Sequence, residues 1–302
     1  MELIGEVELR RRLPMAAAID ALEEGFRSGD PAAAAPLRSH LDTADGALYL
    51  MPAATPEAGA GVKVITITPS NPDRSLPMVN GVYVLFRPGT QEPEAVFDGA
   101  ALTAIRTAAV SGLATRFLAR PDAHRLVVFG AGVQARAHVE AMRAVRPVDD
   151  VVIVSRTAAR ARSLASEIGG RVGEPDAVAD ADLVCTCTTS RVPVCDGALL
   201  AEGVHVNAIG AYTPDTREVD DAAVRRADVI VVETAEVALA EAGDLLLAFD
   251  SPAEARLAIS SDLAGLVRGK AVRTGGRQRT LFVSVGMAFE DLLVARAAVN
   301  AG

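Results

Sequence analysis

The chain has 302 residues, half of them hydrophobic, and carries a formal net charge of −9. This length fits one large domain or, more typically, two. The acidic balance argues against a nucleic-acid surface, and no apolar run approaches the ~18 residues that cross a bilayer. The N-terminus is acidic and lacks the apolar core of a signal peptide. We therefore expect a soluble, cytoplasmic protein that binds neither nucleic acid nor a membrane.

The potential metal ligands are scattered. The three cysteines and four histidines form no C-x-x-C motif and no cluster in the sequence. Zinc sites need closely spaced ligands, so we expect no metal site, and the thiols are interpreted as buried side chains.

The N-terminal half begins with a helix and continues as strands. Residues 14–27 form an amphipathic pattern that predicts a helix, and the alanine-rich stretch 31–35 is expected to be a linker. Two hairpins are predicted, 36–41 with 46–51 and 78–87 with 94–97, on either side of a strand at 62–68. The short connections indicate a mostly antiparallel sheet.

Lysine is rare in this chain, and one lysine lies in an unusual place. Only two lysines, Lys63 and Lys270, stand against 28 arginines. Lys63 shares a strand face with Ile65 and Ile67, where an ammonium group is costly unless it is paired. The alternative is that Lys63 protects an edge strand from aggregation.

A second cation lies beside an apolar helix face. Asp98 is expected to cap a helix at 99–119 that Pro121 ends, and Arg106 lies next to the apolar side of this helix. Arg38 lies on a predicted strand of the N-terminal half. Cations in apolar settings favour a pocket that binds a carboxylate.

The segment from Arg125 to His138 predicts a dinucleotide site. An apolar strand at 126–129 leads into the turn Gly130-x-Gly132-x-x-Ala135 and a helix at 133–145. In such sites the first glycine permits a tight turn, the second admits the pyrophosphate, and the third small residue lets the helix approach the strand. The N–H groups at the helix start then face the phosphate.

The next strand, 150–155, ends where a nicotinamide cofactor meets its adenosine ribose. The residues there are Ser155, Arg156 and Thr157, without the carboxylate that is usual for NADH. Arg156 can pair with a 2′-phosphate, so we expect NADPH rather than NADH. Alternatively, Arg156 is a solvated arginine at the start of a helix.

Strands and helices then alternate. Helices are predicted at 157–168 and 220–227, and strands at 183–188, 203–210, 229–233 and 280–284, before a last helix at 287–300. This pattern predicts an α/β fold with a Rossmann-type doubly wound parallel sheet, joined to the β-rich half. Ligands bind beyond the carboxyl ends of such strands. That rule places Thr186, Thr188, Ala208, Ile209 and the turn 211–215 near the cofactor.

Four segments together resemble one family. Residues 98–109 (Asp-Gly-x-x-Leu-Thr-Ala-x-Arg-Thr-Ala-Ala), 129–135, 207–215 and 284–288 are similar to the ornithine cyclodeaminase/mu-crystallin family, and the similarity covers essentially the whole chain. The resemblance implies a substrate-binding and dimerisation domain at 1–118 with 287–302. It also implies a Rossmann domain at 119–286, and a homodimer.

The resemblance also implies roles for individual residues. It assigns the substrate carboxylate to Arg38, Lys63 and Arg106, a substrate contact to Val285, and a role in proton transfer to Asp215, which could equally be a turn residue. Arg106 is expected to contact the cofactor too. The other implied cofactor contacts are Val133, Gln134, Ser155, Arg156, Thr157, Thr186, Ala208, Ile209 and Ser284.

Two departures from the family's cyclodeaminases favour a reductase. Tyr212 and Tyr49 stand where those enzymes carry carboxylates for a diamino acid, so the distal ammonium would lack an anionic partner. We expect an NADPH-dependent reductase that acts on C=N bonds of small cyclic 2-imino acids, giving L-proline or L-pipecolate. An amino-acid or opine-type dehydrogenase, a cyclodeaminase and a non-catalytic NADPH-linked binding protein remain alternatives.

Overall fold

Two β-sheets organise the chain, one in each of two units. The computed structural model describes residues 1–302. Residues 1–106 with 287–302 form the first unit, and residues 107–286 form the second. One boundary lies inside helix α4 (Gly99–Leu118) rather than after residue 118, where the sequence analysis put it. The second half of α4 belongs to the second unit because its side chains bond there, as when Thr115 contacts Met142 and Asn207.

The first unit is built on a six-stranded sheet in the order β1-β6-β5-β4-β3-β2. Its strands β2 to β6 pair antiparallel, as predicted, while β1 adds parallel to β6. The strands are β1 (Glu2–Ile4), β2 (Ser39–Thr43), β3 (Gly46–Thr55), β4 (Gly59–Ile67), β5 (Val79–Phe86) and β6 (Pro93–Asp98). The helices are α1 (Glu6–Arg12), α2 (Met15–Ser28), α3 (Pro31–Ala34) and α12 (Ala288–Asn300).

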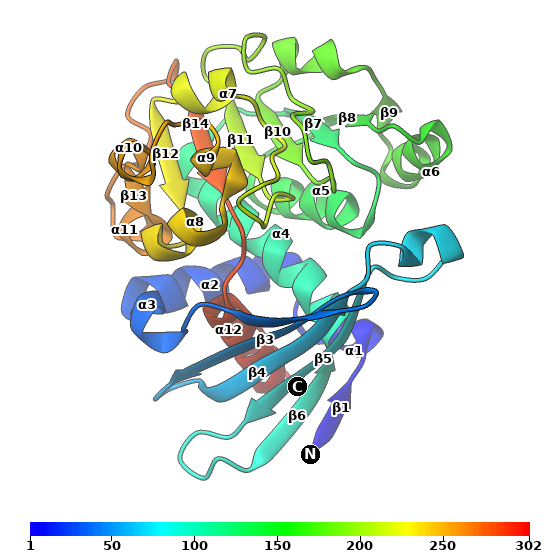
Figure 1. Cartoon of the computed structure of the whole chain (residues 1–302), viewed down its shortest axis with the longest axis vertical. Coiled ribbons are helices and arrows are strands. Elements are labelled where there is room, and N and C mark those ends of the chain that lie inside the picture. Colours follow the sequence, from blue (N-terminus) through cyan, green and yellow to red (C-terminus); the bar gives the residue numbers. More distant parts are fainter. The chain divides into compact units, whose positions relative to one another are not determined.

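The two faces of this sheet differ. One face packs against α12, which also contacts α2, as Figure 1 shows. Alternate residues of β3 to β6 are buried there, including Met51, Lys63, Tyr83 and Phe97. The other face carries apolar side chains that stay partly or fully exposed: Leu50, Val62, Val64, Val82, Val84 and Val96. Both faces of this sheet therefore carry apolar side chains, but the chain covers only one of them, so the other is an uncovered hydrophobic surface.

The second unit is built on an eight-stranded, entirely parallel sheet in the order β13-β12-β14-β11-β10-β7-β8-β9. The strands are β7 (Arg125–Phe129), β8 (Asp150–Val154), β9 (Arg171–Val172), β10 (Leu183–Thr186), β11 (His205–Ala208), β12 (Val229–Val232), β13 (Ser261–Asp262) and β14 (Thr280–Val283). The chain enters at β7, winds outward to β8 and β9, then returns to β10 on the other side. The strand order therefore reverses between β7 and β10, which is where doubly wound sheets bind ligands.

Helices cover both faces of the parallel sheet. Figure 1 shows α6 (Ala158–Ile168) at the edge near β8 and β9, and the short helices α8 (Ala235–Glu241), α10 (Pro252–Ala258) and α11 (Leu263–Val267) at the edge near β12 and β13. The remaining helices are α5 (Val133–Val145), α7 (Asp221–Arg225) and α9 (Gly243–Leu246). The doubly wound α/β architecture expected from the alternation is confirmed.

Several local predictions hold and others do not. Asp98 Oδ1 accepts the N–H groups of Ala100 and Ala101, which caps α4 as expected. The stretch 31–35 is not a plain linker, because Asp30 caps the short helix α3. Arg38 lies just before β2 rather than in it, since that strand begins at Ser39.

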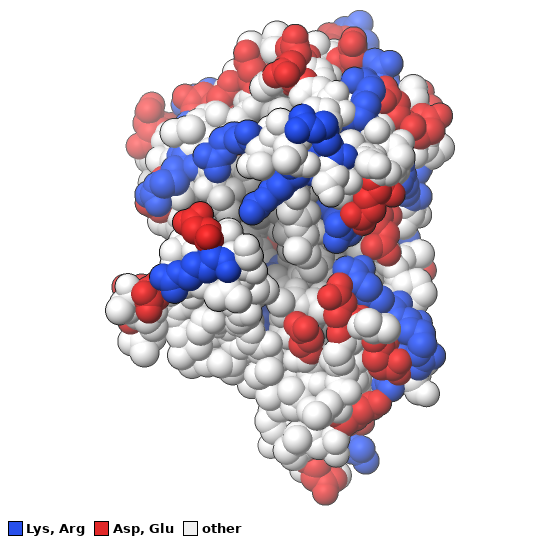
Figure 2. Space-filling model, turned by 90° about the vertical axis from the view of Figure 1, so that its right-hand side faces the viewer, with Lys and Arg blue, Asp and Glu red and all other residues white.

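Both signs of charge are present on the face of the molecule that Figure 2 shows. On the face shown in Figure 2, basic and acidic side chains alternate, and neither sign forms a broad patch. No helix combines the length and the apolarity that crossing a bilayer requires.

Candidate active site

Four charged side chains form a buried cluster in the first unit. Lys63 on β4 points to the covered face of the sheet, where its Nζ lies 2.9 Å from Oδ1 and 2.8 Å from Oδ2 of Asp291. Arg106 on α4 lies 3.0 Å from Oε2 of Glu290 and 3.2 Å from Oδ1 of Asp291. Lys63, Glu290 and Asp291 are fully buried, and Arg106 is 5% exposed. The edge-strand interpretation of Lys63 is therefore wrong, because β4 is an inner strand and its ammonium is inside the unit.

The surroundings of Lys63 favour loss of its proton. Burial and the nearby Arg106 lower the pKa of Lys63 to about 8, while the Asp291 carboxylate opposes that change. Arg38 also lowers the pKa of Lys63, so the three cations predicted for a carboxylate pocket influence one another electrostatically. A lysine that titrates near neutral pH is suited to exchange a proton during a reaction.

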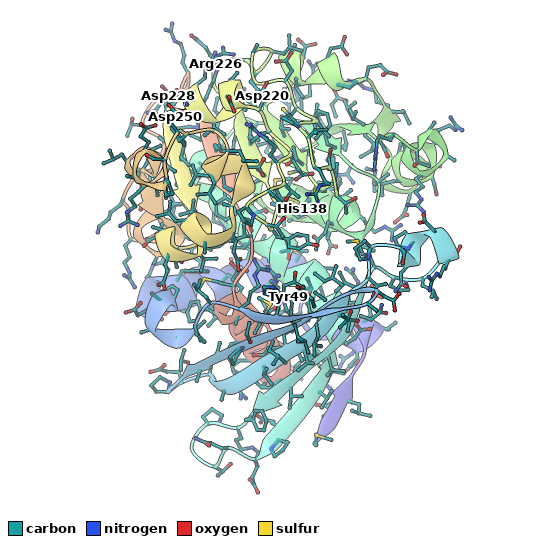
Figure 3. The ribbon with its side chains drawn as sticks, in the orientation of Figure 1. Tyr49, His138, Asp220, Arg226, Asp228 and Asp250 are labelled. Atoms are coloured by element: carbon teal, nitrogen blue, oxygen red, sulfur yellow. The ribbon has the colours of Figure 1, made fainter.

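Aromatic residues flank this cluster. Tyr83 is the cross-strand partner of Lys63 on β5 and is fully buried, and Gly61 leaves room for its ring. Tyr49, on β3, stacks on His40 with ring centroids 5.7 Å apart, and Figure 3 shows its position on the strand.

In the second unit, the glycine turn has the geometry of a phosphate-binding turn. Gly130 has φ 109° and an N–H that bonds to the carbonyl of Val154, and a Cβ at this position would lie 2.4 Å from the carbonyl oxygen of Cys187. Gly132 precedes α5 and has open space where a Cβ would stand. The first turn of α5 has no side-chain cap and no acidic residue, so its N–H groups remain available to an anion. These residues fit the pyrophosphate of a dinucleotide.

The side chains next to this turn differ in exposure. Val133 is 62% exposed at the start of α5, and Gln134 carries a buried Oε1 that accepts no hydrogen bond within the chain. Ala135 is fully buried, which lets α5 lie close to the sheet. His138, labelled in Figure 3, is buried between Gln134 O and Ser111 Oγ, so it is a core residue.

The end of β8 presents polar side chains and no carboxylate. Ser155 Oγ accepts the N–H of Thr157 at 3.3 Å, and Thr157 precedes α6. Arg156 between them is exposed and makes no ion pair within the chain. The guanidinium is therefore accessible to an anion from solvent.

The ends of β10 and β11 are joined by a buried acid. Glu218 accepts the N–H of Thr188 at 2.5 Å and the N–H of Gly210 at 2.7 Å. It thereby ties the segment after Thr186 to the segment after Ala208 and Ile209. Burial raises the pKa of Glu218, and hydrogen bonds from Thr188 and Thr186 oppose that rise.

A second buried acid lies behind Glu218. Asp244 Oδ1 accepts the N–H groups of Glu218 and Val219 at 2.6 Å and 2.8 Å. Burial and the neighbouring Glu218 raise the pKa of Asp244 to about 7.

A third buried acid organises the segment after β14. Glu233, which follows β12, accepts the N–H of Val285 at 3.2 Å, the N–H of Gly286 at 2.9 Å and the hydroxyl of Ser284. Ser284 and Val285 are thus held by one carboxylate.

Asp215 lies in an exposed turn. It contacts Arg191 and accepts the Thr213 hydroxyl at 2.8 Å, and these two partners lower its pKa. The charged residues labelled at one end of the second unit in Figure 3 also have local structural contacts. Asp220 caps α7, and Asp228 accepts the N–H of Arg279.

Five buried acids were not among the predicted site residues. Glu218, Glu233, Asp244, Glu290 and Asp291 are all fully buried. A signal existed for the last two, because consecutive acids interrupt an otherwise apolar helix. Glu233 also ends an apolar strand and Asp244 precedes three leucines, whereas Glu218 lies in a polar segment that gave no reason to expect burial.

Known proteins resemble this chain over most of its length. The model of the ornithine cyclodeaminase/mu-crystallin family matches residues 1–300. The chain belongs to this family. It is 37% identical over 245 residues to a Δ1-pyrroline-2-carboxylate reductase of Bacillus cereus, covering 78% of this chain and 75% of the relative. It is 35% identical over 286 residues to the ketimine reductase mu-crystallin of Rattus norvegicus, covering 92% and 88%.

A solved structure is similar over the whole length. The Δ1-pyrroline-2-carboxylate reductase of Thermococcus litoralis, in complex with NADH and L-proline, superposes with a TM-score of 0.92 at 31% identity, covering 100% of this chain and 97% of that one. An archaeal alanine dehydrogenase dimer with bound NAD superposes with a TM-score of 0.90 at 29% identity, covering 100% and 95%. The family resemblance seen in the sequence is confirmed.

Proposed function

We propose that this chain is an NAD(P)H-dependent reductase of small cyclic 2-imino acids, converting Δ1-pyrroline-2-carboxylate or Δ1-piperideine-2-carboxylate to L-proline or L-pipecolate. The observation that carries the proposal is the buried cluster of Lys63 and Arg106 in a member of this family. Relatives named as reductases of such substrates align with most of the chain.

The cations of the first unit would bind the substrate carboxylate. Arg106 presents a planar guanidinium, which suits a two-point contact with a carboxylate, and Lys63 and Arg38 add positive charge. The reduced nicotinamide, when bound, supplies the hydride. Lys63 would supply the proton that the imine nitrogen needs, because its pKa of about 8 lies close to neutral pH.

Asp215 is a poor source of that proton. Its carboxyl is exposed, and Thr213 and Arg191 lower its pKa, so it is ionised at neutral pH. We assign Asp215 to the turn.

The turn of the second unit and its neighbours would bind the cofactor. Gly130, Gly132, Val133 and Gln134 would contact the pyrophosphate region, and Ser155 to Thr157 the adenosine ribose. Other contacts would come from the strand ends: Thr186, Thr188, Ala208, Ile209 and Ser284. Arg106 would contact the cofactor as well as the substrate, with Val285 next to the substrate.

NADPH is the proposed reductant. The exposed, unpaired Arg156 and the absence of an acid in the triplet that follows β8 support it. In kinetics with both cofactors, we expect Arg156→Ala to raise KM for NADPH at least about tenfold and to leave KM for NADH nearly unchanged. Equal effects on both cofactors would contradict the assignment.

A homodimer is proposed through the uncovered face of the first sheet. Val82 is 42% exposed and Leu50 is 41% exposed on that face, among other apolar side chains. Light scattering after size-exclusion chromatography should give a dimer mass, and Val82→Glu should shift it towards the monomer. A monomeric wild-type chain would overturn this part of the proposal.

The deciding experiment is an assay of reduced-nicotinamide oxidation with freshly prepared five- and six-membered cyclic imino acids. Turnover that Lys63→Met and Arg106→Ala each lower by about 10²–10⁴ in kcat/KM would support the proposal. Ammonia release from ornithine without net cofactor turnover would instead identify a cyclodeaminase. Oxidation of an open-chain amino acid alone would identify a dehydrogenase, and cofactor binding without turnover would identify a binding protein.

A further inference from the structure

Consecutive acids in the first turn of α12 pair with the two buried cations. Asp291 contacts the Lys63 ammonium with both carboxylate oxygens and also lies 3.2 Å from Nε of Arg106, while Glu290 contacts Nη1 of Arg106. The residues come from β4, α4 and α12, and Asp291 and Lys63 are 228 positions apart in the sequence. An arrangement assembled from three elements, with every member almost completely buried, is a built site rather than an incidental surface pair.

Of the two acids, Asp291 is the one that contacts Lys63. Asp291 is the carboxylate that raises the pKa of Lys63 through charge and a hydrogen bond, against the lowering by burial. Glu290 accepts the guanidinium of Arg106 and also faces the N–H of Met287 at 3.4 Å. Asp291 is therefore the carboxylate that contacts the Lys63 ammonium, while Arg106 is held by both acids, by Glu290 at Nη1 and by Asp291 at Nε.

We propose that Asp291 is the positioning residue that keeps Lys63 protonated and directed, so that Lys63 is the proton donor to the substrate nitrogen, while Glu290 orients Arg106 for the carboxylate. This inference rests on the proposed reductase function. Without Asp291, the ammonium would be buried next to Arg106 with no carboxylate partner of its own.

The chemical step balances with the groups named. The imine carbon gains a hydride from the reduced nicotinamide, which is oxidised, and the C=N bond becomes a single bond. One N–H bond of Lys63 breaks as an N–H bond forms on the substrate nitrogen. Lys63 is left as a neutral amine and regains a proton from solvent before the next turnover.

The other titratable groups around Lys63 do not replace it in this role. Burial and Asp291 raise the pKa of Tyr83 well above its usual range, so Tyr83 stays neutral at working pH. Arginines remain charged throughout. The full set facing the cluster is Arg38 before β2, Tyr83 on β5, Arg106 on α4, and Glu290, Asp291 and Arg296 on α12.

Direct titration of Lys63 tests the proposal without turnover. The chain has only two lysines, so protein labelled with isotope-enriched lysine gives two side-chain signals, and Lys270→Arg identifies which belongs to Lys63. We expect the midpoint of Lys63 to fall by at least about one pH unit in Asp291→Asn and by much less in Glu290→Gln. An unmoved midpoint in Asp291→Asn overturns the inference even if the reductase function is correct.

Kinetics give the second readout. We expect Asp291→Asn to lose about fivefold or more in kcat at about pH 8 but about twofold or less at about pH 6, where Lys63 is mostly protonated in both forms. Glu290→Gln should raise KM for the imino acid with an unmoved pH profile. A loss in Asp291→Asn that is the same at both pH values would mean a merely structural role and refute the proposal.

A conservative variant keeps the test decisive if Asp291→Asn does not fold. Asp291→Glu retains the charge but moves it by one methylene, so the Lys63 midpoint should stay near that of the wild type while kcat falls. A midpoint that falls in Asp291→Glu, or a kcat that does not change, would contradict the positioning role. If the labelled protein titrates as expected but reduces no imino acid, the proposed function fails while the pairing of Asp291 with Lys63 stands.

Discussion

Substitution of Glu233 tests how the second unit holds the segment Ser284 to Gly286, which is proposed to contact the cofactor and the substrate. Its buried carboxylate accepts the N–H groups of Val285 and Gly286 and the hydroxyl of Ser284. Glu233→Gln keeps the shape but replaces one acceptor oxygen with an NH₂ group. That group would face a backbone N–H or the Ser284 hydroxyl, so at least one donor loses its acceptor.

The size of the effect follows from those contacts. Hydrogen bonds to a charged group contribute about 1.5–3 kcal/mol each, and a buried unsatisfied donor costs about 1–3 kcal/mol. We expect Glu233→Gln to lower the free energy of unfolding by about 2–4 kcal/mol. The matched control, Ser284→Ala, removes only the hydroxyl and should cost about 1 kcal/mol.

Urea denaturation and cofactor titration measure the two consequences. The unfolding midpoint should fall without a change in m-value, and the Kd for the reduced cofactor should rise about tenfold, because Ser284 is proposed to contact it. A change below about 0.5 kcal/mol with unaltered cofactor binding would refute the reasoning. It would show that the three contacts do not fix the segment.

Three other predictions concern buried groups. Burial lowers the pKa of His138 from 6.5 to about 4 and that of His205 from 6.5 to about 3. Because folding lowers these pKa values, the stability that each neutral histidine contributes is present above about pH 6.5 and is lost on acidification. For His138 alone the loss is about 3 kcal/mol at about pH 4. The free energy of unfolding measured across pH should show this loss, and His138→Gln should reduce it. Asp244 has the opposite sign: its pKa is raised from 3.8 to about 7, so the stability that it contributes falls as pH rises from about 3.8 and is lost once pH passes about 7, and Asp244→Asn should flatten that limb in the same experiment. Gly130→Ala should lower the free energy of unfolding by about 2–3 kcal/mol and weaken cofactor binding, because Gly130 has a positive φ and a Cβ there would meet the carbonyl of Cys187. A variant with normal stability and normal cofactor binding would contradict the strain argument.

Local patterns in the sequence determined much of the architecture. The run 126–129, the glycine turn and the helix after it predicted β7, the turn and α5 to within a residue, because strand and helix periodicity are properties of neighbouring residues. The cap by Asp98 was equally local. The scarcity of lysine drew attention to Lys63, since a cation on an apolar strand face needs a partner.

The sequence patterns did not predict several of the short helices and strands. The helices α8 to α11 and the two-residue strand β13 have too few residues to show a period, and packing against β12 and its neighbours decides them. Arg38 falls outside its predicted strand for a similar reason, because pairing with β3 sets where β2 begins.

Only the tertiary structure identified the partners of the functional cations. The local sequence does not indicate that Lys63 pairs with Asp291 or that Arg106 pairs with Glu290, because the paired residues are 228 and 184 positions apart in the sequence. The sequence by itself determined which residues were chemically out of place and which family they resemble. The tertiary structure decided which charges neutralise one another, because a buried charge is tolerated only where folding brings its partner within hydrogen-bonding distance.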